Sequence, residues 1–266
     1  MNYFLRFFKS ELTKFLYERE NYIIFLLPLL LVFYGFIVWI TATNAHFQNS
    51  RSLSLEASPW FFYYRETFFL MPAIYVIIST GISHKNIDLE HRRRMWKYIF
   101  AVPKAEIYLI PTKQLTIMLW LFLSLTIGYL FTLGFGFLIT WLNPSVPFKE
   151  HDCFFDLLAL LYLKLYLFLI PIILLHTYIS LFFRFNILLS VLAPCFIWLT
   201  GIDWIPHNIP LYQIFRVFFY NGFNKVDFRT SFIFFDKYIV LALLYSLSII
   251  IIGQFLLRKN IYKIIN

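Results

Sequence analysis

Six apolar runs, each long enough to cross a lipid bilayer, constrain this chain of 266 residues more than any other feature. A helix needs about 20 apolar residues to span the hydrocarbon core of a membrane. Hydrophobic residues make up 61% of the chain and charged residues only 14%, whereas a soluble domain has about 45–50% and about 25%. We therefore predict an all-α polytopic membrane protein with six transmembrane helices. The predicted spans are residues 21–42, 67–83, 114–142, 157–183, 187–204 and 238–257.

The first 20 residues predict a different kind of helix. Aromatic and aliphatic side chains recur there at helical spacing, and most charges fall elsewhere on the helical wheel. Such an amphipathic helix is expected to lie in the plane of the membrane surface as an elbow before the first span. The apolar positions are Phe4, Phe8, Leu12, Phe15 and Leu16.

Residues 205–237, before the last span, are apolar but interrupted. Pro206, Pro210, Gly222 and Asn224 divide this stretch into pieces too short for a full crossing. We expect a re-entrant or interfacial pair of short helices on the outer face. Irregular backbone at membrane depth must be buried in protein or line a water-filled cavity.

The distribution of basic residues predicts the orientation in the membrane. Residues 87–113 hold six of the 23 basic residues and lie between the second and third spans. Loops rich in lysine and arginine stay on the cytoplasmic side. Fifteen basic residues fall in the segments that this places inside and seven in those outside, so both termini are expected in the cytoplasm. The net charge of +9 then reflects loops near anionic lipid, and no nucleic-acid partner is expected.

No motif in the sequence indicates catalysis. The phosphate-binding GxxxxGK[ST] pattern, the GxSxG elbow and the HExxH helix are all absent. Two cysteines, Cys153 and Cys195, lack the spacing of a zinc site. We assign no catalytic residue, no metal ligand and no cofactor to this chain. If ATP drives the protein, another chain must hydrolyse it.

The loop over residues 84–112 has two interpretations. Residues 88–100 have helical character with apolar side chains such as Trp96 among the charges, and Pro103 ends the helix. A short amphipathic helix below the membrane can insert into a cleft of a soluble partner. It can equally lie on the membrane and extend its arginines to lipid headgroups. Physical reasoning alone favours neither.

A family resemblance favours the first interpretation. The order Glu90, Trp96-Lys97, Pro103 and Lys113 resembles the cytoplasmic-loop pattern of ABC-2 type exporter permeases, particularly the lantibiotic-immunity-like branch. The amphipathic elbow, the six spans and the broken outer segment are similar to the layout of that family. The run from His91 to Arg94 departs from it, because a small residue often follows the acidic position there.

The resemblance implies a single permease domain over residues 1–266, multi-pass in the bacterial cytoplasmic membrane. It implies pairing with a second permease copy or related permease, and with ABC ATP-binding subunits that bind ATP and Mg. Residues 88–103 would form the coupling helix, and the substrate exported would be a hydrophobic or amphipathic molecule. The residues expected to couple to the ATPase are Asp88, Glu90, Arg92, Arg93, Trp96, Lys97, Pro103 and Arg184.

Two polar residues inside the fourth span are weaker candidates for a substrate path. Lys164 is costly in the hydrocarbon core, and we expect it to snorkel toward the outer interface or to pair with Asp156. His176 is twelve residues further on, and we expect a hydrogen-bonded packing role for it. Convergence of both with Glu66 would instead indicate an intramembrane enzyme. A membrane anchor or sensor subunit without transport activity is the other alternative.

Overall fold

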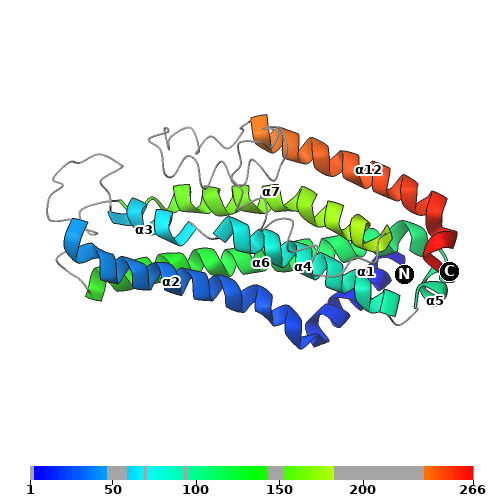
Figure 1. Cartoon of the computed structure of the whole chain (residues 1–266), viewed down its shortest axis with the longest axis horizontal. Coiled ribbons are helices and arrows are strands. Elements are labelled where there is room, and N and C mark those ends of the chain that lie inside the picture. Colours follow the sequence, from blue (N-terminus) through cyan, green and yellow to red (C-terminus); the bar gives the residue numbers. More distant parts are fainter. Residues whose placement is uncertain are drawn as a thin grey trace.

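The computed structural model describes residues 3–46, 59–68, 71–92, 95–142, 152–182 and 237–265, and every element in them is a helix. The long helices run side by side along the molecule, with both chain termini and α5 at one end (Figure 1). We call this the terminal end, and the end that carries α3 the far end. The elements are α1 (Tyr3–Tyr17), η1 (Arg19–Tyr22), α2 (Ile23–His46), α3 (Pro59–Phe68), α4 (Met71–Arg92), α5 (Trp96–Phe100), α6 (Ala105–Leu142), α7 (Phe155–Phe182) and α12 (Lys237–Ile265).

Three described helices are long and apolar enough to cross a membrane: α6, α7 and residues Ile239–Asn260 of α12. They confirm the third, fourth and sixth predicted spans. The first predicted span falls on α2, which contains the shorter apolar stretch Pro28–Ile40, and the second falls mostly on α4. The fifth span and nearly all of the outer segment 205–237 lie outside the described residues.

Helices extend far into the loop predicted over residues 84–112. Helix α4 continues through Arg92, and α6 already begins at Ala105. The helical character expected over residues 88–100 is confirmed for residues 88–92 and 96–100, but these residues belong to two elements, the last turns of α4 and the short α5. The chain turns between them, where the Met95 amide donates to the Glu90 carbonyl at 3.0 Å. Pro103 lies in the turn after α5, as expected for a residue that ends the helix.

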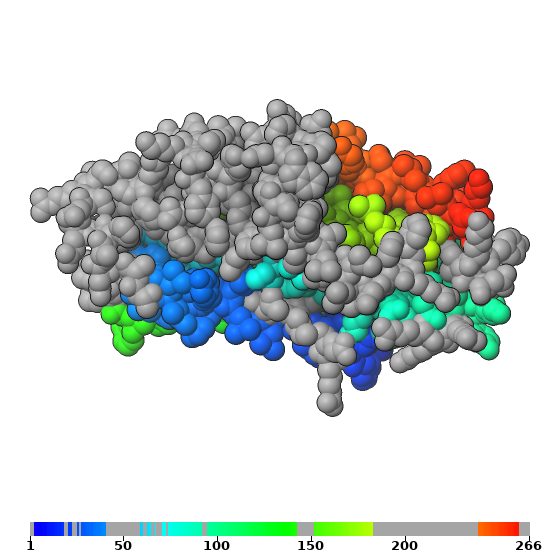
Figure 2. All heavy atoms as spheres, viewed as in Figure 1, coloured from blue at the N-terminus to red at the C-terminus, as the bar shows by residue number. Residues whose placement is uncertain are grey.

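Two apolar clusters hold the helices together. The larger one fills the space among α2, α3, α4, α6 and α7, with Tyr75, Leu121 and Phe168 among its buried members. The smaller one lies at the terminal end and fixes α5 against its neighbours through Trp96 and Leu257. Helices α7 and α12 pack against each other and are visible together on the face in Figure 2.

Helix α1 is amphipathic, as predicted, and packs on α6. It buries Glu11 and Phe15, and the Phe15 ring stacks on Trp120 of α6 at 5.3 Å. Leu5, Leu16 and Tyr17 are exposed on it. Placement of α1 in the plane of a membrane surface stays a prediction.

Candidate functional site

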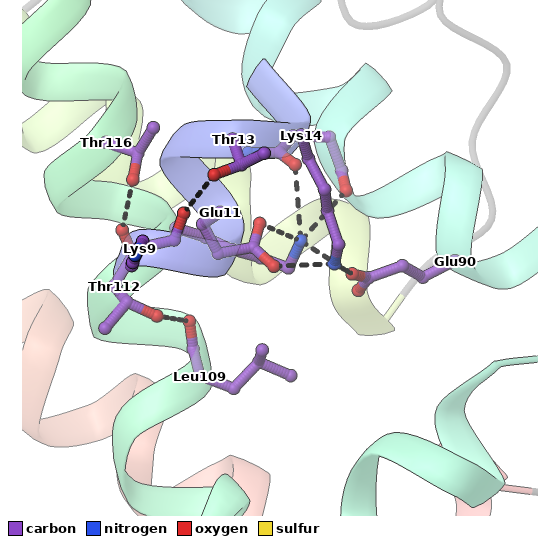
Figure 3. Close-up of polar contacts among 10 residues, drawn as sticks. Lys9, Glu11, Thr13, Lys14, Glu90, Leu109, Thr112 and Thr116 are labelled. Atoms are coloured by element: carbon purple, nitrogen blue, oxygen red, sulfur yellow. Dashed lines mark hydrogen bonds and ion pairs between the residues drawn. The ribbon is translucent and has the colours of Figure 1, made fainter. Parts of the chain in front are cut away.

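Four charged side chains meet at the terminal end of the bundle, and we call them the ionic cluster: Glu11, Lys14, Glu90 and Lys113. The Lys113 ammonium lies 2.8 Å from Glu11 Oε2 and 2.8 Å from Glu90 Oε1. Lys14 lies 2.7 Å from Glu11 Oε1 and 3.1 Å from Glu90 Oε1. Figure 3 shows Glu11 and Lys14 projecting from α1 toward Glu90. Each lysine therefore bridges both carboxylates.

Three of the four members of the ionic cluster are almost sealed from solvent, and Lys14 is partly exposed. Lys113 is 0% exposed, Glu11 2% and Glu90 4%. Charges buried to this extent are strongly destabilising unless they are paired and hydrogen-bonded. Lys113 also donates to the side-chain oxygen of Asn86 at 3.2 Å, which adds a neutral acceptor. Two acids and two bases give the cluster no net charge, so burial is tolerated.

Attraction between opposite charges in the cluster keeps Glu11 and Lys14 ionised. Burial alone would raise the pKa of Glu11, but attraction to Lys113 and Lys14 outweighs it and keeps that pKa below its ordinary value of 4.5. Burial would likewise lower the pKa of Lys14, and attraction to Glu11 and Glu90 raises it above 10.5 instead. Both groups are therefore charged throughout the physiological range.

The cluster joins three helices that are distant in sequence. Glu11 and Lys14 are three residues apart on α1, so they lie on one face of that helix. Glu90 is in the last turn of α4, and Lys113 is two turns into α6. The cluster thereby ties the N-terminal helix to both helices that flank α5.

Helix α5 is held from its inner side by Trp96. This side chain is 2% exposed, donates from Nε1 to Nδ1 of His91 at 3.0 Å, and stacks on Phe100. The opposite side of the same segment faces outward, and Tyr98 is 78% exposed. We call the outward residues the α5 surface; they are Lys97, Tyr98, Ala101, Val102, Pro103 and Lys104.

The predicted coupling residues do not form one contact surface. Glu90 and Trp96 are buried and hold helices together, whereas Lys97 and Pro103 are exposed on the α5 surface. Asp88 is half-buried on α4. For Arg92 only the helical backbone is described, and Arg93 and Arg184 lie outside the described residues.

Sequence reasoning missed the partners of Glu90. Lys113 was noted only as a basic residue of the loop pattern, Lys14 only as a charge of the elbow, and Glu11 was given no role in the elbow. One signal was available: Glu11 is three residues after Phe8 and four before Phe15, so it lies on the apolar side of the amphipathic helix. An acid on an apolar helix face needs a buried cation, which Lys113 supplies.

Lys164 and His176 are not brought together. They lie on the same helix, α7, about 18 Å apart along its axis at 1.5 Å per residue. Lys164 is 2% exposed and Asp156 is exposed, and the snorkelling toward the outer interface or pairing with Asp156 expected of Lys164 stays a prediction. His176 is half-buried, and its Nδ1 has no hydrogen-bond partner within the described part of the chain; the hydrogen-bonded packing role expected for this residue stays a prediction.

The enzyme alternative requires Glu66, Lys164 and His176 to converge, and Lys164 and His176 lie far apart on α7. The Glu66 side chain lies outside the described residues, so its convergence with Lys164 and His176 is untested. Within the described ranges, no three His, Cys, Asp or Glu residues lie close enough to hold a metal ion.

Apolar spanning helices and a charged terminal end with an exposed loop define a multi-pass α-helical membrane protein. The family model for an ABC-2 family transporter protein matches residues 7–201, which include most of α1, all described elements from η1 through α7, and the whole ionic cluster. The chain therefore belongs to the ABC-2 transporter family. Neither the curated proteins nor the solved structures include one that matches it.

Proposed function

We propose that this chain is the membrane-spanning permease subunit of an ATP-driven ABC exporter, and that it moves a hydrophobic or amphipathic substrate out of the cytoplasm or the membrane. Family membership supports a permease, and the missing phosphate-binding motif assigns ATP and Mg to a separate ABC ATP-binding subunit. The single observation that carries the proposal is the exposed α5 surface. It lies between α4 and α6, and the ionic cluster links both of these helices to α1.

The α5 surface has the chemistry of a protein contact. It combines a lysine, an exposed aromatic ring and an exposed valine in adjacent turns, at Lys97, Tyr98 and Val102. Tyrosine is enriched at protein interfaces because it offers a large contact area and one polar group. We place the ATPase contact here, with the terminal end of the bundle in the cytoplasm.

Movement of α5 would be passed on through its buried side. Trp96 packs in an apolar cluster with Leu109 of α6, Leu181 of α7 and Leu257 of α12. The ionic cluster links the same end of α4 and α6 to α1. A displacement of α5 by the ATPase therefore acts on spanning helices and on the N-terminal helix together. A second permease, identical or related, would complete the translocation path.

The test is copurification of the full chain with a candidate ABC ATP-binding subunit from the same source, followed by ATP hydrolysis in reconstituted vesicles. We expect the double change Lys97→Glu and Tyr98→Ala to lower recovery of the ATPase at least tenfold, with the thermal stability of the permease unchanged. Tyr17→Ala removes an equally exposed tyrosine from α1 and serves as the matched control. Full assembly and full hydrolysis in the double variant would refute the contact.

A further inference from the structure

A half-open pocket of about 250 Å³ lies beside the ionic cluster, between the end of α1, η1 and the last turns of α4. Its size is below the roughly 300–1,000 Å³ typical of pockets for drug-sized ligands, so it suits a smaller polar group. The ATPase contact proposed above does not use it. Its polar lining residues are Lys14, Glu18, Asn21, Asn86 and Glu90.

One oxygen of a buried carboxylate in this lining has no partner. Both lysines of the ionic cluster bond to Oε1 of Glu90, and Oε2 accepts no hydrogen bond within the described structure. An unpaired buried acceptor costs about 1–3 kcal/mol, more when it is charged. A hydrogen-bond donor that enters the pocket and displaces the partly exposed Lys14 chain slightly would relieve this cost.

Among the described side chains, the charges that line the pocket are balanced by their partners. The ionic cluster is neutral, and Glu18 pairs with Lys85 at 3.5 Å. A ligand with a single charge would therefore leave a net charge in a half-enclosed site, whereas a zwitterion would not. Both signs have a counterpart at the pocket: Lys14, whose side chain is 44% exposed, for an anion, and Glu18 with Glu90 for a cation.

The pocket lies where α2, the first predicted span, begins. Asn21 of the lining lies in η1, two residues before the start of α2, and exposed apolar side chains recur along one face of α2 from the next turn onward, at Leu26, Leu30 and Phe33. Tyr17, also in the lining, is 83% exposed. A polar headgroup in the pocket would thus have an apolar surface nearby for acyl chains.

We propose that this pocket binds the zwitterionic headgroup of an aminophospholipid, with Lys14 holding the phosphate and Glu18 and Glu90 accepting hydrogen bonds from the primary ammonium. The lipid would come from the cytoplasmic leaflet, a placement that rests on the orientation proposed above. Bound there, the lipid would contact the end of α1 and the last turn of α4 together.

The test uses the purified full chain without an ATPase, so its outcome is independent of whether the proposed transport function holds. Native mass spectrometry and thermal unfolding would compare dioctanoyl phosphatidylethanolamine, phosphatidylcholine and phosphatidylglycerol with free glycerophosphoethanolamine. We expect phosphatidylethanolamine to bind at least fivefold more tightly than phosphatidylcholine, because a quaternary ammonium cannot donate a hydrogen bond. Free glycerophosphoethanolamine, which has the same phosphodiester headgroup without acyl chains, should bind more weakly than the lipid.

Substitutions of lining residues test whether phosphatidylethanolamine binds in this pocket. Glu18→Gln and Lys14→Gln should each weaken phosphatidylethanolamine binding at least fivefold, and Glu106→Gln, which neutralises an exposed carboxylate on α6 outside the lining, should leave it unchanged. Lys14 belongs to the ionic cluster, so Glu18→Gln decides the matter if the Lys14 variant is unstable.

Any one of five results would overturn the proposal. Equal binding of phosphatidylethanolamine and phosphatidylcholine, or unchanged binding in Glu18→Gln, would mean that the pocket does not recognise the headgroup. Preference for phosphatidylglycerol would indicate general attraction of anionic lipid to a basic protein. Free glycerophosphoethanolamine binding as tightly as the lipid would make the ligand a soluble zwitterion. Absence of binding by all three lipids would leave the pocket without a lipid ligand.

Discussion

At the terminal end of the bundle, α1, α4 and α6 are joined through paired charges, whereas toward the far end α3, α4, α6 and α7 meet through aromatic rings, glycines and neutral hydrogen bonds. The ionic cluster represents the first kind of joint. In the second, the Tyr162 hydroxyl lies 2.7 Å from Thr132 Oγ1 and the Tyr75 hydroxyl 3.0 Å from Ser124 Oγ. The ring of Trp60 also packs closely against Gly136 in this second joint.

This difference follows from where each joint lies on the spanning helices. A charged side chain in the hydrocarbon core is costly, so helix contacts there use small residues and neutral hydrogen bonds. Lys113 is near the start of α6, whereas Thr132 and Gly136 are in its second half. The charged joint should therefore respond to changes of charge and pH, and the neutral joint to changes of side-chain volume. Three substitutions test this contrast.

Lys113→Met should have the largest effect. It leaves Glu11 and Glu90 buried with only the partly exposed Lys14 to compensate them. Breaking a buried ion pair from one side costs about 3–5 kcal/mol of unfolding free energy. Denaturant unfolding in detergent, followed by tryptophan fluorescence, would measure it. Lys97→Met, at an exposed position, is the control and should change stability by less than about 0.5 kcal/mol. Equally small changes in unfolding free energy in both variants would mean that the charged joint contributes nothing to stability.

Glu11→Gln should have an intermediate effect that depends on pH. Glutamine keeps the shape but loses the charge-assisted hydrogen bonds, which are worth about 1.5–3 kcal/mol. Because Lys113 and Lys14 hold the pKa of Glu11 below 4.5 in the folded protein, its stabilisation is fully present above pH 4.5. It is lost as the pH falls through the lower folded value.

The stability difference between wild type and Glu11→Gln should therefore be constant from pH 6 to 9 and shrink below pH 4.5. The raised pKa of Lys14 keeps that group charged over the same range, since its contribution is lost only as the pH rises above 10.5. Unfolding curves at a series of pH values give the difference. Glu106→Gln, on an exposed carboxylate, should show no such trend. A difference that persists unchanged into acid would contradict the assignment of the charges.

The helical spans could be predicted from the sequence because their cause is local. Twenty or more apolar residues in a row dictate a membrane helix regardless of their neighbours, and α6, α7 and α12 are such cases. The division of residues 88–100 into the end of α4 and α5 was not predictable in this way. It depends on Trp96 packing with Leu181 and Leu257, which are distant in the chain.

The site was only partly predictable for the same reason. The loop pattern drew attention to Glu90, Trp96 and Lys113, but pattern alone does not say whether a conspicuous charge faces a partner or the interior. Glu90 is buried because a lysine 23 residues later and a helix 76 residues earlier provide its cations. Pairings across such separations leave no periodic signal. Glu11 on an apolar helix face was the one local sign of them.

Gly136→Ala should have the smallest of the three effects and tests the neutral joint. A Cβ atom at Gly136 would collide with the ring of Trp60, which is itself buried, so the ring must shift. Overpacking of this kind costs about 1–3 kcal/mol, offset by up to about 1 kcal/mol of gained helix propensity. We expect a net loss of about 1–2 kcal/mol, independent of pH. Gly134→Ala on the same helix meets nothing within 4 Å and should be neutral or stabilising. If the two alanine variants behave alike, the far end is not closely packed and the contrast between the joints fails.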